Sequence, residues 1–451
     1  MRIKKLPVLS RVIMTAMAAM VPGVTMAAGF QLTEQSVTGL GRAFAGSAAI
    51  AEDATTIFFN PAGLTELEGT ELMLGASVII LGADFDREVA VDATGQPLTG
   101  GEGGDVGKPG APPFLYFARP INDEWTFGLG VNAPFGLSTD YDPDWVGRYQ
   151  GVYSNVTTLN LNPSLGWKIN DNWSLGFGLN AMHMRVKLTN IVDYGIVCYN
   201  FVNPVTCNGL GLNPQQHDGY AEIEGDSWGF GFNVGVLWKN DATRIGLHYR
   251  SEIDHDLEGD ARFENAPAVF TATHRFINQG IQADFTTPQT LSLSVAHDIN
   301  EQFTISGDVT WTGWDSFEEI RVNFDNYDPE TGSGQPPTVQ PENWKNVMRY
   351  SLGLDWRYDP KWTFRAGLAY DETPVSDETR TPRLPDADRT WLALGASWQA
   401  SENLRMDFGY AHLFLDDDIV LNEVGASMQD TLIGTYEASA DIFGAALRYQ
   451  F

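Results

Sequence analysis

Alternation of apolar and polar residues runs through most of this chain, which is the period expected of β-strands with one apolar face. In the stretch 173–181 every odd position is apolar: Trp173, Leu175, Phe177, Leu179 and Ala181. The even positions carry serine, glycine and asparagine, and Arg349, Arg357 and Arg365 fall on the polar faces of two later stretches. A charge at a lipid-facing position is costly, so the pattern predicts strands of a membrane barrel whose arginines line the lumen.

Counting such stretches predicts fourteen strands, an even number as bacterial outer-membrane barrels require. They span 70–85, 113–119, 125–138, 156–169, 173–189, 227–239, 243–262, 285–298, 303–323, 344–358, 362–371, 389–399, 404–421 and 436–451. Tight polar turns alternate with long loops, which are 86–112, 190–226, 263–284, 324–343 and 372–388. We therefore predict an all-β fold, a 14-stranded antiparallel transmembrane β-barrel with periplasmic turns and outer loops. A soluble sandwich would need polar outer faces that these strands lack.

The stretch 28–69 does not follow this pattern. It is rich in glycine, alanine and serine and shows no sustained alternation of any period. A barrel of about 14 strands encloses a lumen too wide for wall side chains alone to fill, so something must close it. We predict that residues 28–69 form a hatch, a plug inside the lumen, and that 70–451 form the barrel. The alternative is an N-terminal domain that lies outside the pore.

Residues 1–27 have the organisation of a secretory signal peptide. A basic start precedes an apolar core from 12 to 24, and Thr25-Met26-Ala27 offers a cleavage site before Ala28. A membrane anchor is the alternative, but the apolar core is short and contains Pro22. Together with the barrel pattern, the signal peptide predicts a location in the bacterial outer membrane.

Composition excludes some classes of function. The chain has 28 lysines and arginines against 58 aspartates and glutamates, a formal net charge of -30, which excludes nucleic acid as a natural partner. Its mean hydropathy is only -0.19, and no apolar run approaches the ~18 residues of a membrane helix. Most carboxylates fall in the long loops, where a solvated, self-repelling surface and a divalent-cation site are both open interpretations. No loop has regular ligand spacing, so we predict no metal and no cofactor.

The two cysteines of the chain, Cys198 and Cys207, lie close together in one predicted outer loop. In a secreted protein this spacing favours a disulfide that staples the loop. A zinc site would need further ligands at matching spacing, and none is near.

Several short motifs, in this order and spacing, resemble the FadL family of outer-membrane long-chain fatty-acid transporters. They are Gly29-Phe30-Gln31-Leu32, Gly39-Leu40-Gly41-Arg42-Ala43, Asn60-Pro61-Ala62, Pro120-Ile121-Asn122-Asp123, Trp173-Ser174-Leu175-Gly176-Phe177-Gly178, Trp228-Gly229-Phe230-Gly231, Tyr249-Arg250-Ser251-Glu252, Trp362-Thr363-Phe364-Arg365 and Pro385-Asp386-Ala387-Asp388-Arg389. The resemblance runs from the expected mature start to the last residue. It implies a fourteen-stranded barrel with an N-terminal hatch that takes up hydrophobic substrates by diffusion, without an energy source.

The resemblance also implies a route. Substrate lands in an apolar groove among the outer loops, moves to a buried site near the hatch, and leaves sideways into the membrane at a kinked third strand. Here the kink falls at Asn132-Ala133-Pro134-Phe135-Gly136, where proline removes a ladder donor and glycine permits an unusual backbone. A simple barrel bulge is the alternative. Phe30 and Asn60-Pro61-Ala62 are the hatch residues that we expect to take part in opening.

For a substrate carboxylate the family uses a small polar cluster. Its lysine corresponds to Lys345, which regular alternation places inward, one period above inward Arg349. A cation in an apolar pocket can hold a carboxylate, although Lys345 could equally be a lumen lysine paired with a wall carboxylate. The family's arginine after strand five corresponds to Asn190, and its serine in the kink to Ala133. Either Arg185 or Lys187 substitutes, or the substrate has a weaker polar head than a fatty acid.

Competing functions remain to be separated. Members of the same family also carry aromatic hydrocarbons, and the loss of two polar carboxylate contacts leaves that alternative open beside the leading hypothesis, long-chain fatty acids. A general diffusion porin has no use for a plug of forty residues. An outer-membrane hydrolase would need a nucleophile and a base, but none of the strand histidines lies in a motif such as G-x-S-x-G or H-E-x-x-H, so we predict no enzyme. The expected partners are a long-chain fatty acid or another hydrophobic small molecule, outer-membrane lipid and lipopolysaccharide, and we expect a monomer.

Overall fold

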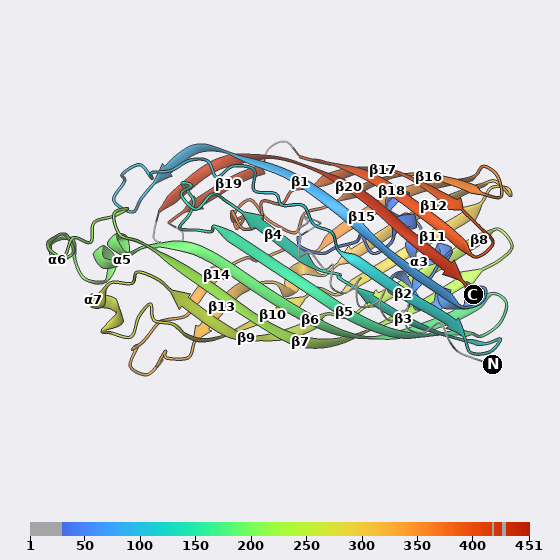
Figure 1. Ribbon diagram of the computed structural model, residues 1–451, viewed down its shortest axis with the longest axis horizontal. Helices are drawn as coiled ribbons and strands as arrows, with labels where there is room; N and C mark the ends of the chain where they lie inside the picture. Colours follow the sequence, from blue (N-terminus) through green and yellow to red (C-terminus); the bar gives the residue numbers. More distant parts are fainter. Residues whose placement is uncertain (1–28, 417–418, 426–429) are drawn as a thin grey trace.

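The computed structural model describes residues 29–416, 419–425 and 430–451. Its strands form one closed antiparallel barrel, because β1 (Glu71–Val91) pairs with β2 (Pro113–Pro120) on one side and with the last strand, β20 (Thr431–Gln450), on the other (Figure 1). The predicted signal peptide, residues 1–27, lies outside the described residues.

Fourteen strands make up the barrel wall, and six of them consist of two segments. The undivided strands are β1, β2, β5 (Tyr153–Lys168), β6 (Trp173–Asp193), β7 (Asp218–Lys239), β16 (Trp362–Asp371), β17 (Arg389–Gln399) and β20. The divided strands are β3 (Trp125–Asn132) with β4 (Gly136–Asp140), β8 (Thr243–Arg250) with β9 (Ile253–Phe263), β11 (Thr290–Asp298) with β10 (Gln279–Thr287), β12 (Phe303–Thr312) with β13 (Glu319–Phe324), β15 (Val347–Arg357) with β14 (Thr338–Pro341), and β18 (Leu404–Leu415) with β19 (Ile419–Val424). The predicted strand number is confirmed.

The outer halves of several strands are longer than predicted. β7 begins at Asp218 and β10 at Gln279, both inside stretches that we expected to be loops. The reason is physical: where a strand rises beyond the membrane, its outer face meets water, and the apolar alternation that marks a strand in the sequence disappears.

Alternation between the two faces of the wall follows the prediction. Along β6 the odd positions from Trp173 to Leu179 are exposed toward the membrane, and the even positions are buried. Arg349 and Arg365 are buried in the lumen. Pairs of aromatic residues stack on the outer surface next to the tight turns, as in Trp125 with Trp167 at 5.5 Å between ring centroids, which matches an interfacial girdle.

Most of the tight turns share one chemical device. In five of the six hairpin turns, the first residue accepts hydrogen bonds through its side-chain Oδ1 from backbone N–H groups two and three residues later, and these residues are Asn122, Asn170, Asn240, Asn300 and Asp359. The sixth turn begins with Ser401 and is closed by backbone hydrogen bonds to Leu404. These turns lie at the end of the barrel that holds the C-terminus, opposite the long loops (Figure 1).

The long-loop end carries the helices α5 (Tyr194–Phe201), α6 (Pro204–Gly209) and α7 (Ala268–Thr271). The predicted disulfide between Cys198 and Cys207 is present and joins α5 to α6. In the described part of the chain, no helix combines the length and the apolar character needed to cross a membrane.

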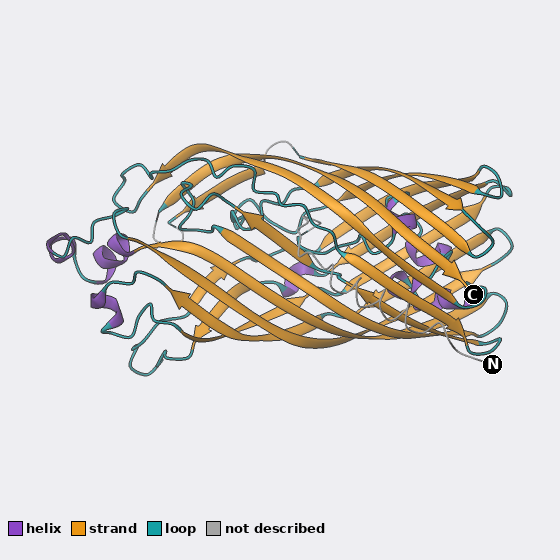
Figure 2. Ribbon diagram, viewed as in Figure 1, coloured by secondary structure: helices purple, strands orange, loops and turns teal. Residues whose placement is uncertain are grey.

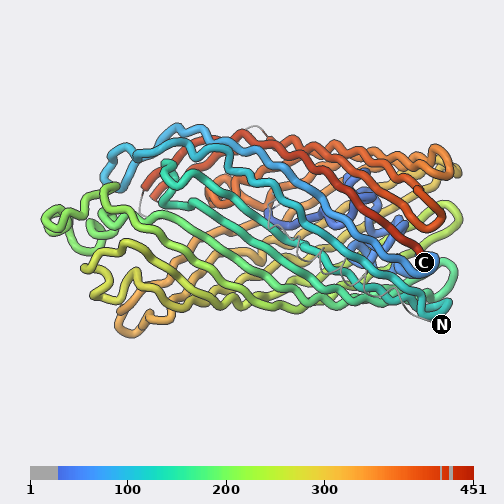
Figure 3. Tube along the Cα trace, viewed as in Figure 1, coloured from blue at the N-terminus to red at the C-terminus, as the bar shows by residue number. Residues whose placement is uncertain are grey.

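Residues 30–67 lie inside the barrel (Figures 2 and 3). They form three single-turn helices, α2 (Val37–Leu40), α3 (Ser47–Ile50) and α4 (Thr56–Phe59), and the 3-10 helix η1 (Pro61–Glu66). Wall glycines let this segment approach closely: a Cβ at Gly176 would lie 2.0 Å from the backbone nitrogen of Ala62. We call residues 30–35 the upper hatch and residues 36–67 the lower hatch.

Ion pairs fasten the lower hatch to the wall. Glu52 accepts from Arg42 of the hatch at 2.6 Å, from Arg365 of β16 at 2.8 Å and from Arg405 of β18 at 3.2 Å. Lys239 of β7 pairs with Glu66 at 2.5 Å. Buried charges are tolerated only when they are paired in this way, so the contacts of Glu52 with Arg365 and Arg405, and of Glu66 with Lys239, hold the lower hatch on the wall.

Candidate functional site

The third strand is broken between β3 and β4. Three residues, Ala133, Pro134 and Phe135, lie opposite only two residues of β5, so the ladder contains a bulge where the sequence predicted a kink. β4 pairs with β5 but forms no ladder with β2, unlike β3. The interruption has the geometry of the bulge that was the alternative to a kink, and its role in substrate exit stays a prediction.

The upper hatch supplies the hydrogen-bond partners of the broken strand. Leu32 N–H donates to the carbonyl of Pro134 at 2.8 Å, and Gly136 N–H donates to the carbonyl of Phe30 at 2.9 Å. The side-chain amide of Gln35 donates to the carbonyl of Ala133 at 2.7 Å. The hatch therefore satisfies the freed backbone groups at Ala133, Pro134 and Gly136, whereas those of Phe135 bond to the side chain of Thr158 on β5.

Above the upper hatch lies a small apolar cavity with Phe30 at its hatch side. Phe30 packs within 5.8 Å, between ring centroids, of five other aromatic rings: Phe135, Phe285, Trp314, Phe317 and Trp344. The free space is about 70 Å³, room for a few water molecules only. The structure is therefore a closed state, in which this aromatic cluster fills the room that a large ligand would need.

A much larger groove, of about 720 Å³, opens among the outer loops. Its walls include the apolar side chains of Val192, Val197, Phe201, Phe263, Phe276, Phe324 and Val339. Groove and cavity share five lining residues, which we call the neck: Leu188, Ile223, Ile320, Val322 and Arg383. Groove, neck, cavity, Phe30 and the broken strand thus follow one another from the outside inward.

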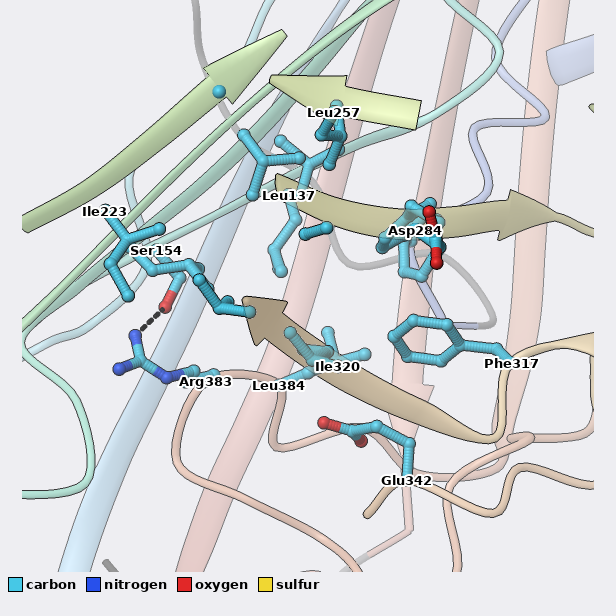
Figure 4. Close-up of a pocket in the computed structure, with 18 of the residues that line it drawn as sticks. Leu137, Ser154, Ile223, Leu257, Asp284, Phe317, Ile320, Glu342, Arg383 and Leu384 are labelled. Carbon is cyan, nitrogen blue, oxygen red and sulfur yellow. Dashed lines mark hydrogen bonds between the residues drawn. The ribbon is translucent and has the colours of Figure 1, made fainter. Parts of the chain in front are cut away.

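Arg383 is the charged member of the neck (Figure 4). It lies in the segment 372–388, which we predicted to face outside but which folds back into the barrel mouth, where most of its residues are buried. Its Nη1 donates to Ser154 Oγ at 3.1 Å and to the carbonyl of Thr189 at 3.3 Å. Within the described residues, none of its hydrogen bonds goes to a carboxylate.

Glu342 faces the same cavity from the irregular stretch between β14 and β15 (Figure 4). Its carboxyl accepts a hydrogen bond from the indole Nε1 of Trp344 at 3.0 Å. β15 alone, with 11 residues, is long enough to cross the hydrocarbon, so Glu342 lies outside the membrane-spanning segment. Burial raises the pKa of Glu342 to about 8, against the smaller opposing effect of Arg383. Burial likewise lowers the pKa of Arg383 to about 10, and Arg383 stays charged at neutral pH.

The predicted inward placement of Lys345 is wrong. Lys345 is exposed and does not line the cavity, whereas its neighbour Trp344 does. Regular alternation from Arg349 through Val347 predicts an inward Lys345, but the stretch 342–346 is not a strand. Beyond such an irregularity the side chains that point inward are one position away from those that regular alternation predicts. Trp344 therefore points into the lumen in place of Lys345.

The proposed replacement of a family arginine by Arg185 or Lys187 also fails on geometry. Both side chains lie on the outer face of β6, where Arg185 pairs with Glu224 and Lys187 pairs with Glu222 at 2.7 Å. Alternation along β6 places Val186 and Leu188 in the cavity instead. An odd position on this strand cannot reach the lumen without a bulge.

The remaining predicted residues lie at three different levels. Asn190 lines the outer groove, and Ala133 lies in the strand break, where its carbonyl accepts from Gln35. Arg349 lies below the cavity, where it donates to the carbonyl of Ala43 in the lower hatch at 3.1 Å and faces Asp371 at 3.9 Å. The structure does not bring these residues together into one carboxylate site.

Asn60-Pro61-Ala62 anchors the lower hatch. The Asn60 side chain caps η1 by accepting from Ala62 N–H at 3.1 Å, and its amide donates to Ala48 and, across to the wall, to the carbonyl of Val236 at 3.1 Å. A role of these residues in opening stays a prediction.

Sequence reasoning missed Arg383, Glu342 and Gln35. Arg383 stands two residues before the motif Pro385-Asp386-Ala387-Asp388-Arg389, and a dense run of prolines and charges in a long loop was the available signal. Glu342 and Gln35 had none, because both lie in stretches without periodicity. No group of three or more potential metal-ligating side chains occurs in the part of the chain that the structure describes.

A family model described as "Outer membrane protein transport protein (OMPP1/FadL/TodX)" matches residues 18–451. An outer membrane protein of Neisseria meningitidis serogroup B is 31% identical over 444 residues, which cover 94% of this chain and 95% of that protein. A long-chain fatty acid transport protein of Escherichia coli O6:H1 is 28% identical over 449 residues, 96% of each chain.

Two solved structures share the fold. A Pseudomonas aeruginosa FadL homologue has a TM-score of 0.85 at 25% identity, covering 94% of this chain and 100% of that one. The toluene transporter TbuX of Ralstonia pickettii has a TM-score of 0.65 at 22% identity, covering 92% and 97%.

Proposed function

This chain belongs to the OMPP1/FadL/TodX family of outer-membrane transport proteins, and from that premise we propose that it takes up long-chain fatty acids by passive diffusion. Members of the family are transporters or channels for hydrophobic substrates in the outer membrane. The relative from Escherichia coli O6:H1 is named a long-chain fatty acid transport protein.

The observation that carries the proposal is the succession of groove, neck, cavity, Phe30 and broken strand along one line. A groove of about 720 Å³ falls in the ~300–1,000 Å³ range of pockets that hold extended organic ligands, and a single aromatic ring would leave most of it empty. Each methylene group of the substrate that moves from water to this apolar lining stabilises the complex by about 0.8 kcal/mol. A long acyl chain uses this surface best.

The proposed route ends at the third strand. Substrate moves from the groove through the neck and displaces the aromatic cluster around Phe30. It then leaves through the wall at the break between β3 and β4, where the upper hatch residue Leu32 bonds to Pro134 in the closed state. A lateral exit spares the acyl chain from contact with periplasmic water. The motion requires a shift of the upper hatch, because Phe30 occupies the space between cavity and break.

Uptake of an aromatic hydrocarbon is the second candidate. The closed cavity is small and lined by aromatic rings, and Ala133 and Asn190 stand where the family's polar contacts are found. TbuX, which shares the fold, is named a toluene transporter.

The experiment compares uptake of labelled palmitate and labelled toluene in bacterial cells that lack such channels and express this chain. Trp344→Ala enlarges the cavity, and Phe201→Ala removes part of the groove wall. The substitution Phe364→Ala, on the lipid-facing side of the barrel, is a matched control. We expect the wild type to take up palmitate, Phe201→Ala to take up less of it, and Phe364→Ala to take up as much as the wild type. Toluene uptake without palmitate uptake would move the assignment to aromatic hydrocarbons.

A further inference from the structure

The neck contains one feature that apolar transport does not require, a cation. Four of its five residues are aliphatic, and the fifth is Arg383. An arginine in an apolar passage costs desolvation free energy unless an anion compensates it. Arg383 and Glu342 line the same cavity, yet the ion pairs of the described residues do not include one between them. Among the described residues, the guanidinium therefore has no carboxylate at ion-pair distance, and only the longer-range effect of Glu342 on its pKa is present.

Its free donors point to the missing partner. The hydrogen bonds of Arg383 within the described chain all use Nη1, and they go to Ser154 and to the carbonyls of Tyr153 and Thr189. Nη2 and Nε are left without a partner there, and these two N–H groups form the fork that carboxylate and sulfonate groups accept side by side. Arg349, by contrast, is held by Ala43 and Asp371.

We propose that Arg383 binds the anionic headgroup of an amphiphilic substrate at the neck, with the tail in the cavity toward Phe30. This inference rests on the proposed function and adds the residue that holds the headgroup, its place in the neck and the orientation of the substrate. The apolar cavity beyond the neck has Phe30, Leu257, Phe285 and Phe317 in its lining, so the tail and not the head belongs there. Arg383 also replaces the cation that Lys345 does not supply.

Glu342 makes this site sensitive to pH. Its raised pKa, about 8, keeps it neutral at pH 7, when it leaves Arg383 available to the substrate. Above that pH the ionised carboxylate competes with the substrate for Arg383 and repels its headgroup. Among the described residues, the other charged groups that line the groove and cavity are Glu378, Glu423 and Asp284, and Glu423 adds to the rise in the pKa of Glu342. The titratable Tyr141 lies beside Arg383, where its hydroxyl donates to the carbonyl of Pro382. Glu423 itself has a pKa raised to about 7 by burial, so its ionisation precedes that of Glu342.

The test uses two probes with the same tail: dodecane-1-sulfonate, which is anionic at every pH used, and dodecan-1-ol, which is neutral. Equilibrium binding of each labelled probe is measured on the purified full chain in nanodiscs of zwitterionic lipid. Arg383→Met keeps the length of the side chain and removes the charge, and the outward-facing Arg185→Met is the matched control. Folding of each variant is checked by its heat-dependent shift in gel mobility.

At pH 7 we expect Arg383→Met to weaken sulfonate binding at least tenfold, as loss of a charge-assisted hydrogen bond does, and to change dodecanol binding less than twofold. Arg185→Met leaves both unchanged. Equal weakening of the two probes would make Arg383 structural, and no weakening of either would also overturn the headgroup site. If either of these results is found and the wild type still takes up palmitate, the proposed function stands and the headgroup site is rejected. If the wild type binds neither probe and takes up no palmitate, the proposed function itself is rejected.

The pH dependence of probe binding tests the role of Glu342. Sulfonate affinity of the wild type should fall as pH rises from 7 to 9, a range that ends below the pKa of about 10 of Arg383 itself. Over the same range Glu342→Gln should hold its affinity constant, and Glu423→Gln should retain the fall above pH 8. Dodecanol affinity should stay level in all three proteins. A parallel fall in wild type and Glu342→Gln would remove Glu342 from the site and leave Arg383 to be judged by the first arm.

Discussion

The two parts of the hatch are held in different ways. The lower hatch is fastened by ion pairs of Glu52 with three arginines and of Glu66 with Lys239. The upper hatch is held by ring packing around Phe30 and by hydrogen bonds with the broken strand, as in Leu32 to Pro134. Ion pairs inside a protein are costly to separate, whereas apolar and amide contacts can be exchanged for similar ones with a ligand. The difference indicates a fixed lower hatch and an upper hatch that can move.

The largest effect should come from breaking the fixed part. Glu52→Gln removes the carboxylate that Arg42, Arg365 and Arg405 share. Because these arginines keep Asp355 and Asp407 as partners, the cost should stay below the roughly 3–5 kcal/mol of a buried charge left without any partner. We expect the hatch to leave its seat and the steady ion conductance in a planar bilayer to rise. Glu68 is exposed and follows the last residue of the lower hatch, so Glu68→Gln should conduct like the wild type. Unchanged conductance of a folded Glu52→Gln protein would mean that packing alone fixes the lower hatch.

A smaller, local effect should follow from loosening the mobile part. Phe30→Ala removes the ring shared by five aromatic neighbours, a loss of about 3 kcal/mol, or roughly a hundredfold faster amide exchange. Hydrogen exchange followed by mass spectrometry should show this acceleration in residues 30–35 and not in α2 or α3. Phe324→Ala, in the outer groove, is the control. Acceleration spread equally over both parts would show that the hatch moves as one body.

The smallest effect concerns the link between the upper hatch and the wall. Gln35→Leu removes the amide that bonds to the carbonyl of Ala133, a loss of about 1 kcal/mol. We expect about fivefold faster exchange around Ala133 and a modest rise in palmitate uptake. Gln31→Leu, whose amide lies in the same segment but does not bond to the broken strand, should show neither. Slower uptake by Gln35→Leu would mean that this link guides the substrate rather than closing the exit.

The barrel could be predicted from the sequence far better than the site. Within the membrane every second side chain must be apolar, so positions such as Leu175 and Phe177 report their facing directly. Proline and glycine in Pro134 and Gly136 likewise signalled the break in the third strand. At the site, Lys345 was misplaced because alternation was extrapolated into the irregular stretch 342–346, which resets the facing of the chain. Arg185 was misplaced for the opposite reason: it was chosen for its charge, whereas the alternation along β6 already assigns it to the outer face.

The sequence by itself determined the strand number, the facing of the membrane half of the wall, the tight turns, the disulfide and the separate character of residues 28–69. These features depend on local period, on turn chemistry or on the spacing of two cysteines. Only the tertiary structure decided which cation reaches the lumen and which segment covers the broken strand. Arg383 and Ser154 are far apart in the chain, as are Leu32 and Pro134, and their contacts depend on a loop and a hatch that fold back into the barrel. Neither segment has a periodic pattern, because neither has one face toward lipid, and its position is fixed by packing against the whole wall.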